Sequence, residues 1–192
     1  MSEASLLMKL REGDERSFRE LTNLYHDRVY NTSLGLLQHI ENAEDVTQEV
    51  FVEVFRSVSG FKAECKLSTW IYRITVQKSL EHIRSSRRKK RSGILMSLFG
   101  KEDRVNIPGD NSFYHPGIRL ENKEKSAILF GAIAKLPLNQ RTAFTLHKVE
   151  GLSHAEIADI LKTSVSSVES LIFRARQNLR SLLAGYYEKN LR

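Results

Sequence analysis

The spacing of the apolar residues restricts the fold of this chain more than any other feature. Apolar side chains recur every three or four positions, which places them on one face of an α-helix, whereas the alternation typical of strands is nearly absent. Three such stripes lie between residues 15 and 90: Phe18, Leu21, Tyr25 and Val29; Ala43, Val46, Val50 and Val54; and Leu67, Ile71 and Ile74. We therefore expect an all-α fold whose first three helices bury these stripes against one another as a small bundle.

The helical pattern is interrupted over residues 92–119. Glycine, proline, aspartate and asparagine punctuate this stretch, and a structureless loop of that length is unusual inside a compact domain. We expect a flexible linker at 92–119 between two small helical domains, residues 1–91 and 120–192. The linker also carries an apolar patch, residues 94–99, which a plain spacer does not need.

The composition excludes several classes of protein. The chain has 192 residues, of which 41% are hydrophobic and only 10 are glycine and 3 proline, so a packed core is possible. Cys65 is the only cysteine, which excludes an internal disulfide and a multi-cysteine zinc site. No apolar run approaches the roughly 20 residues that span a bilayer, and the N-terminus does not resemble a signal peptide. We expect a cytoplasmic protein without a cofactor.

Charge is distributed unevenly along the chain. The net charge is +7, but residues 1–60 carry a net charge of −5, residues 61–104 of +8 and residues 126–192 of +4. Basic segments favour polyanions, because binding releases condensed counterions. Nucleic acid is therefore the first partner to consider, and an acidic membrane surface is the second.

The C-terminal domain contains a pattern typical of a helix-turn-helix. Helical spacing stops at Pro137 and restarts at Asn139, and Ser153 with Glu156 then forms a Ser-x-x-Glu capping box that predicts the start of a helix. After a break at residues 162–164, a second helix is expected, with three basic residues, Arg174, Arg176 and Arg180. Its cap is expected at Ser166 with Glu169, or at Thr163 or Ser164. Such a helix would lie in the major groove, although an ordinary hairpin with a solvated basic face has the same pattern.

The second helix of the N-terminal domain has an acidic face. Asp45, Gln48 and Glu49 lie opposite the Val46/Val50 stripe. The face suits a basic partner surface. The alternative interpretation is that this face is only exposed to solvent and binds no partner.

These motifs occur in an order that resembles a known family. The segment EDVTQEVF at 44–51, the segment LSTWIYRI at 67–74, the basic run ending at Arg91 and the helix-turn-helix together resemble the sigma factors of bacterial RNA polymerase. The similarity is greatest to the two-domain extracytoplasmic-function group of the sigma-70 superfamily. It covers residues 15–91 (conserved region 2) and 120–184 (region 4).

The resemblance implies roles for particular residues. The N-terminal domain would bind core polymerase at the β′ clamp helices through Asp45, Gln48 and Glu49. It would also recognise and melt the −10 element through Phe61, Lys62, Thr69, Trp70, Arg73, Gln77, Lys78, Arg84, Arg87 and Arg88. The C-terminal domain would contact the β flap and read the −35 element through Ser166, Ser167, Glu169, Ser170, Arg174 and Arg176. Trp70 is equally consistent with a core position.

Three positions stand out against the family pattern. Gln77 and Glu81 replace the usual Asn and Asp, and Glu169 stands where many relatives have a basic residue. A carboxylate at 169 can accept a hydrogen bond from cytosine but repels phosphates. The resemblance also implies control by an anti-sigma factor, often a membrane-anchored one, and no small-molecule substrate.

Two other functions fit parts of the sequence. A free-standing helix-turn-helix regulator would need no polymerase contact, but such proteins usually dimerise on palindromic sites and nothing here indicates a symmetric interface. A nuclease or hydrolase would need a catalytic site, and Asp45 and Glu49 share a helix face that could hold a metal ion. The six histidines are scattered, and a lone cysteine such as Cys65 is usually inert. We therefore expect a protein that is not an enzyme.

Overall fold

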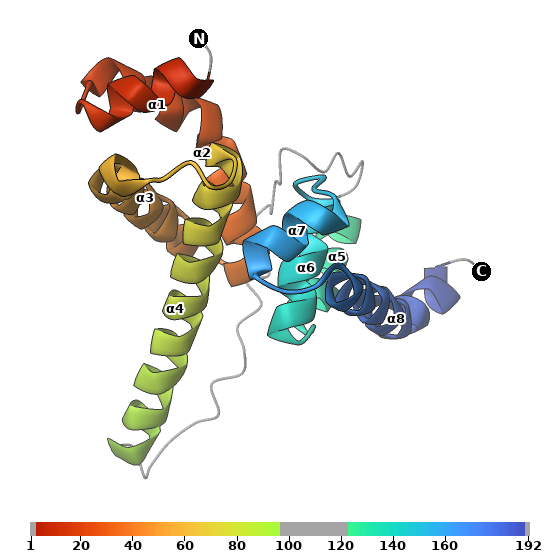
Figure 1. The fold of residues 1–192 in the computed structure, drawn as a ribbon. Coiled ribbons are helices and arrows are strands. Elements are labelled where there is room, and N and C mark those ends of the chain that lie inside the picture. Colours follow the sequence, from red (N-terminus) through yellow and green to blue (C-terminus); the bar gives the residue numbers. More distant parts are fainter. Residues whose placement is uncertain (1–2, 97–122, 191–192) are drawn as a thin grey trace.

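The computed structural model describes residues 3–96 and 123–190, and every regular element in these two ranges is helical (Figure 1). The elements are α1 (Glu3–Arg11), α2 (Glu15–Leu37), α3 (Ile40–Ser57), the 3-10 turn η1 (Val58–Gly60), α4 (Leu67–Met96), α5 (Lys123–Ala134), α6 (Leu138–Lys148), α7 (His154–Leu161) and α8 (Val165–Asn190). The all-α prediction is confirmed. Residues 97–119 of the expected linker, with half of its apolar patch, lie outside the described residues, and residues 92–96 form the end of α4.

The N-terminal part is a bundle of α1 to α4. Its core contains the predicted stripes of all three expected helices, because Leu21, Val50 and Ile71 are each at most 1% exposed. Asp14 caps α2, since its carboxylate accepts hydrogen bonds from the Ser17 N–H at 2.8 Å and the Ser17 hydroxyl at 2.6 Å. These hydrogen bonds lower the pKa of Asp14 below its ordinary value. Helix α1 was not among the predicted helices, and it adds three buried leucines, Leu6, Leu7 and Leu10.

The C-terminal part packs α5 and α6 against the long α8. Phe130, Ile133 and Leu136 meet Ala175 and Leu179 in a second cluster, which explains why α8 continues far beyond a short recognition helix. The predicted stop at Pro137 is confirmed, because Pro137 is the N-cap of α6.

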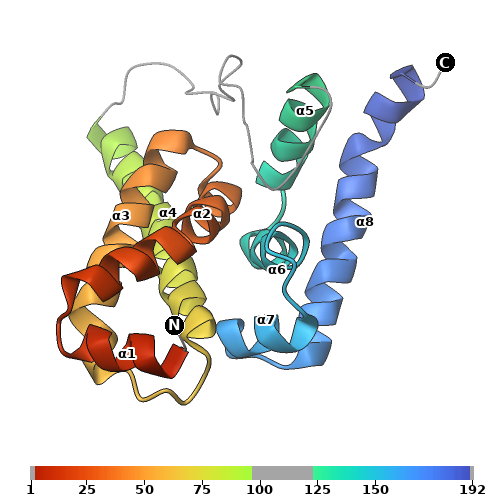
Figure 2. The same ribbon diagram turned by 90° about the horizontal axis from the view of Figure 1, so that it is seen from above.

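The two parts lie against each other. Helix α6 packs on α2, and α7 packs on the first turns of α4 (Figure 2). None of the helices in the described ranges combines the length and apolarity that a membrane span requires.

Candidate nucleic-acid and polymerase interface

Helix α3 presents the predicted acidic face to solvent. Asp45, Gln48 and Glu49 are exposed, while Val46 and Val50 on the opposite side are fully buried. The three polar residues line one side of a groove between α3 and α4, whose other wall includes Lys78 and His82. The spacing of valines therefore fixes the orientation of this helix, because burying the stripe leaves the acidic face outward.

The same helix exposes apolar side chains that sequence reasoning missed. Val52 lies in the groove at 49% exposure, and Phe55 is 54% exposed and meets Phe18 edge to face, with ring centroids 5.0 Å apart. Exposed apolar residues beside charged ones are typical of a protein-binding surface. Both positions fall outside the buried valine stripe at helical spacing, and this was the sequence signal for their exposure.

The segment before α4 holds a buried aromatic pair. Phe61 is 7% exposed and stacks on Trp70, with ring centroids 4.8 Å apart, and both pack against the core of the N-terminal bundle. The Arg11 guanidinium of α1 donates a hydrogen bond to the Phe61 carbonyl at 2.5 Å. Thr69 is also buried, at 5% exposure, whereas Lys62 is exposed. Phe61 and Thr69 therefore shape this segment from inside, and Lys62 is the outward group.

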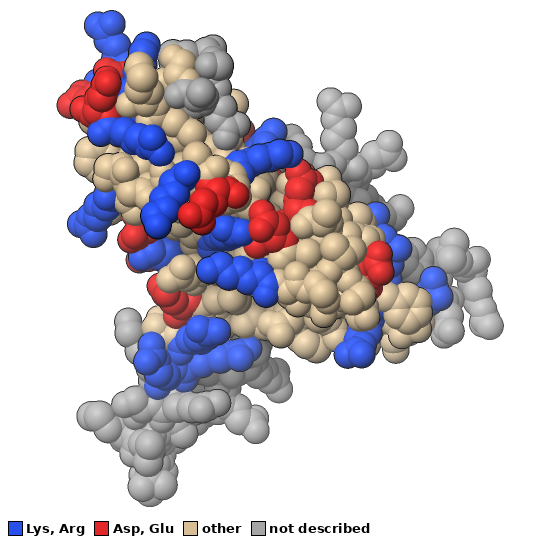
Figure 3. Space-filling view, in the orientation of Figure 1, with Lys and Arg blue, Asp and Glu red and all other residues tan. Residues whose placement is uncertain are grey.

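The second half of α4 carries a basic surface. Arg84, Arg87 and Arg88 are exposed and line one groove, and Lys and Arg side chains gather along this part of the helix in Figure 3. Two of the three positions that depart from the family pattern are bonded to each other, because the Gln77 amide donates to the Glu81 carboxylate at 2.9 Å. That bond places the Glu81 carboxylate beside the arginines, where it offsets part of their positive charge.

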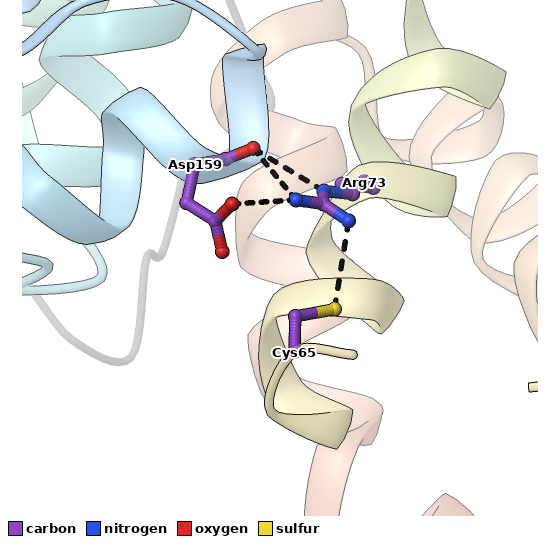
Figure 4. Close-up of polar contacts among 3 residues, drawn as sticks. All are labelled: Cys65, Arg73 and Asp159. Carbon is purple, nitrogen blue, oxygen red and sulfur yellow. Dashed lines mark hydrogen bonds and ion pairs between the residues drawn. The ribbon is translucent and has the colours of Figure 1, made fainter. Parts of the chain in front are cut away.

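Two cations of the predicted −10 surface are held by carboxylates. Lys78 lies 3.6 Å from Glu53 of α3. Arg73 donates to the side chain and the backbone carbonyl of Asp159 on α7, and its third nitrogen lies 3.5 Å from the Cys65 sulfur (Figure 4). Arg73 is therefore directed toward the C-terminal part of the chain.

The helix-turn-helix is formed as the capping residues predict. Ser153 and Glu156 form both hydrogen bonds of the capping box at the start of α7, and the bonds from Ser153 lower the pKa of Glu156. Lys162 adopts a left-handed conformation, φ 52°, which ends α7. Helix α8 begins after Ser164, whose hydroxyl accepts from the Ser167 N–H at 3.2 Å. The cap expected at Ser166 is therefore wrong, and the alternative at Ser164 is confirmed.

Helix α8 exposes most of the residues predicted to read DNA. Ser166, Glu169, Ser170, Arg174 and Arg176 are exposed, and Ser167 is half-buried. These side chains alternate with Val168, Ile172 and Ala175, which are at most 2% exposed. The apolar spacing thus directs the polar face outward along the helix.

Two contacts on α8 were missed from the sequence. The Glu169 carboxylate lies 3.6 Å from the Nδ1 atom of His154, so α7 supplies a partner for it. Phe173 is 60% exposed on the same surface as the arginines. The sequence signal for the exposure of Phe173 was its helical spacing. Phe173 follows the buried Ile172 directly and so falls outside the apolar stripe.

The described residues contain no group of three or more His, Cys, Asp or Glu side chains arranged to hold a metal ion. The groove between α3 and α4 and the groove along the second half of α4 are open and lined mostly by charged side chains.

Comparison with known proteins identifies the family. The family described as "Sigma-70 region 2" matches residues 21–89, and the family described as "Sigma-70, region 4" matches residues 126–179. The chain belongs to the sigma-70 family. The matched segments coincide with the two helical parts, and together they distinguish a sigma factor from a free-standing regulator with a helix-turn-helix alone.

Relatives from several bacteria place the chain in the extracytoplasmic-function group. The RNA polymerase sigma-H factor of Pseudomonas aeruginosa is 29% identical over 93% of this chain and 92% of its own length. The sigma factor SigW of Bacillus subtilis is also 29% identical, over 92% of this chain and 94% of its own length. As an extracytoplasmic-function sigma factor, the chain directs promoter-specific transcription initiation and is not an enzyme.

Solved structures share the fold. The structure of CnrH in complex with the cytosolic domain of CnrY has a TM-score of 0.68, with 20% identity over 95% of this chain and 97% of that one. The sigma factor RpoE of Bartonella quintana, in complex with the anti-sigma factor NepR, has a TM-score of 0.64, with 20% identity over 88% and 98%.

Proposed function

We propose that the two helical parts divide the work of this sigma factor. The N-terminal domain, residues 1–91, binds core polymerase and opens the −10 element, and the C-terminal domain, residues 120–192, binds the −35 element and the β flap. Residues 92–119 connect them. The observation that carries this proposal is the joint exposure of one acidic face, on α3, and two basic surfaces, on α4 and α8.

The α3 face suits a polymerase subunit rather than DNA. Asp45 and Glu49 would repel phosphates, whereas they complement a basic protein surface. The adjacent Val52 and Phe55 add apolar area that becomes buried on binding. We place the β′ clamp contact on Asp45, Gln48 and Glu49, with Val52 and Phe55 as neighbours.

The α4 surface suits the −10 strand. Lys62, Arg84, Arg87 and Arg88 supply exposed positive charge, and Trp70 supplies a half-buried ring beside Phe61. Aromatic stacking and a positively charged groove are the general means of holding unpaired bases. Because Phe61 and Thr69 are buried, we assign them to shaping the segment, with Trp70, Arg73, Gln77 and Lys78 completing the surface.

The α8 surface suits double-stranded DNA. Arg174 and Arg176 lie on its exposed face, where they can contact phosphates or guanine. Polar contacts near the start of the helix come from four further residues: Ser166, Ser167, Glu169 and Ser170. Phe173 adds an apolar group that fits a thymine methyl.

We also propose an anti-sigma factor as a regulatory partner of this chain. The similar solved structures are of complexes with the cytosolic domain of CnrY and with NepR, which motivates the search for such a partner. Because bacterial transcription occurs in the cytoplasm, we expect the chain to act there.

The deciding experiment is binding of the chain to bacterial core polymerase, followed by run-off transcription from a genomic promoter library. We expect binding and promoter-dependent transcripts. Asp45→Ala combined with Gln48→Ala should reduce core affinity, whereas Glu20→Ala, which removes one negative charge from the exposed surface of α2, should not. Equal competition for core polymerase by the double variant would remove the clamp contact from this face.

A further inference from the structure

The contact between the two helical parts has the construction of a packed interface. Leu36 of α2 and Tyr72 and Val76 of α4 belong to one buried cluster with residues of the C-terminal part: Ala143, Leu146, Ile157, Ala158, Ile160, Val168 and Ile172. Several of these, such as Leu36 and Leu146, are fully buried. Apolar burial on this scale excludes water from the contact.

A glycine allows the two backbones to approach. A Cβ atom at Gly35 of α2 would lie 2.5 Å from the Cγ2 atom of Thr145 on α6. Thr145 is 1% exposed and β-branched, so its side chain has little room to turn away. One residue further on, the Leu36 carbonyl accepts a hydrogen bond from the Arg141 guanidinium at 2.9 Å. The chain is therefore shaped at this point for contact between its own domains.

Three polar pairs connect the domains around the apolar cluster. The Arg73 guanidinium donates to the Asp159 carboxylate at 2.6 Å, and the Tyr72 hydroxyl donates to the Glu150 carboxylate at 2.8 Å. Lys66 lies 3.5 Å from the Glu156 carboxylate. All three positive or donor groups come from the segment 66–73, which leads into and forms the start of α4.

The interface and the proposed −10 surface share residues. Arg73 belongs to the proposed −10 surface, yet three of its hydrogen bonds are made to Asp159, and Tyr72 and Val76 are covered by the C-terminal part. A guanidinium bonded in this way to α7 is not available to a phosphate or a base.

We propose that the free chain closes on itself, with α7 covering the start of α4, and that this contact must open before Arg73 can reach promoter DNA. The requirement that the contact open before Arg73 reaches DNA rests on the proposed function of the α4 surface. Only open chains can bind DNA through Arg73. The apparent affinity for DNA is therefore the affinity of the open chain multiplied by the fraction of chains that are open. The linker makes the contact intramolecular, so even a modest interface is occupied at any protein concentration.

Closure is tested by chemical cross-linking of the full chain. A water-soluble carbodiimide joins a lysine amine to a carboxylate only where the two are in contact, and the Lys66–Glu156 pair bridges the domains. We expect the cross-linked peptide, identified by mass spectrometry, in the monomeric fraction of the wild type. Its absence would overturn the proposal.

Two variants should open the interface without touching the proposed DNA contacts. Gly35→Ala introduces the clash with Thr145, and Asp159→Lys places a positive charge against Arg73. Each should lower the cross-link yield several-fold and raise the radius of gyration in small-angle scattering. Thr145→Ala should restore closure in the Gly35→Ala chain, because it removes the clashing atoms. Gly131→Ala is the matched control, since a Cβ there meets nothing within 4 Å. Unchanged compactness in both opening variants would contradict the proposal.

Occlusion is tested with a labelled single-stranded oligonucleotide of mixed sequence at low salt. The Gly35→Ala chain should bind it several-fold more tightly than the wild type, and the Gly131→Ala chain should bind as the wild type does. An opened chain with unchanged affinity would show that closure does not cover the DNA surface. Run-off transcription with core polymerase is scored separately, so a failure of occlusion is distinguished from a failure of the proposed function.

Discussion

At the residue scale, the segment before α4 depends on a contact from outside the matched family regions. Arg11 belongs to α1, which precedes the region 2 match at residue 21, and its guanidinium donates to the Phe61 carbonyl. That bond holds the backbone where Phe61 stacks on Trp70. Arg11 is therefore a positioning residue for the proposed −10 surface.

Replacing Arg11 by alanine should impair promoter opening more than initial binding. Net hydrogen bonds from charged groups contribute about 1.5–3 kcal/mol, and partial exposure reduces this to about 1 kcal/mol. That corresponds to roughly a fivefold loss of open complexes. Permanganate reactivity of −10 thymines measures opening, and Arg19→Ala, which removes an exposed arginine of α2, is the control. Equal reactivity in both variants would leave Arg11 with a packing role only.

The arginines of α8 make a second prediction at this scale. Removing Arg174 and Arg176 together should weaken −35 binding and reduce the slope of log affinity against log salt by about 1.8, because each phosphate contact contributes about 0.9. Filter binding over a salt series measures the slope. Lys135→Ala with Lys148→Ala removes two exposed charges from the same domain and should leave it unchanged. A slope unaffected by the arginine changes would exclude them from phosphate contact.

At the element scale, sequence patterns predicted most helices but not their lengths. The valine stripe of α3, the stop at Pro137 and the Ser153 capping box are local signals, and the structure contains all three. Helix α1 was missed, although Leu6 and Leu10 have helical spacing, because the segment is short. The extent of α8 was missed because its second half is stabilised by α5, through contacts distant in sequence.

The Ser153 cap provides a test of how far local signals stabilise these elements. Ser153→Ala removes the acceptor for the Glu156 N–H and should cost about 1 kcal/mol of unfolding free energy. For a chain of this size that lowers Tm by about 2–4 °C. Thermal unfolding followed by circular dichroism measures the shift, and Ser153→Thr, which keeps the hydroxyl, should lie near the wild type. No loss of Tm would mean that packing against α4 and α8 holds α7 without its cap.

At the scale of the whole molecule, the arrangement of the domains was beyond sequence reasoning. Gly35 and Thr145 meet through the packing of α2 on α6, and neither residue carries a local signal for the other. Similarly, the roles of Tyr72 and Glu150 became visible only where α4 meets the turn after α6. These pairs are separated by about half the chain, so only the folded structure brings them together.

The Glu150 carboxyl makes closure of the domains depend on pH. Burial in the interface raises its pKa from the ordinary 4.5 to about 7, while the Tyr72 hydroxyl and the positive charge of Arg28 act in the opposite direction. In an open chain the carboxyl returns to water and to its ordinary pKa. The closed state therefore binds the proton more tightly, and closure is favoured most below pH 4.5. This contribution is lost progressively as the pH rises to about 7 and is constant above that.

The expected result is a radius of gyration that increases between about pH 4.5 and pH 7 in the wild type, because a rising fraction of chains opens as Glu150 ionises. Glu150→Gln keeps a neutral acceptor for the Tyr72 hydroxyl, so this variant should stay compact across the range. Glu20→Gln, on the exposed surface of α2, should follow the wild type. Because other groups titrate over the same range, the difference between the wild type and Glu150→Gln is the quantity that matters. Parallel curves for these two chains would mean that the Glu150 proton has no part in holding the domains together.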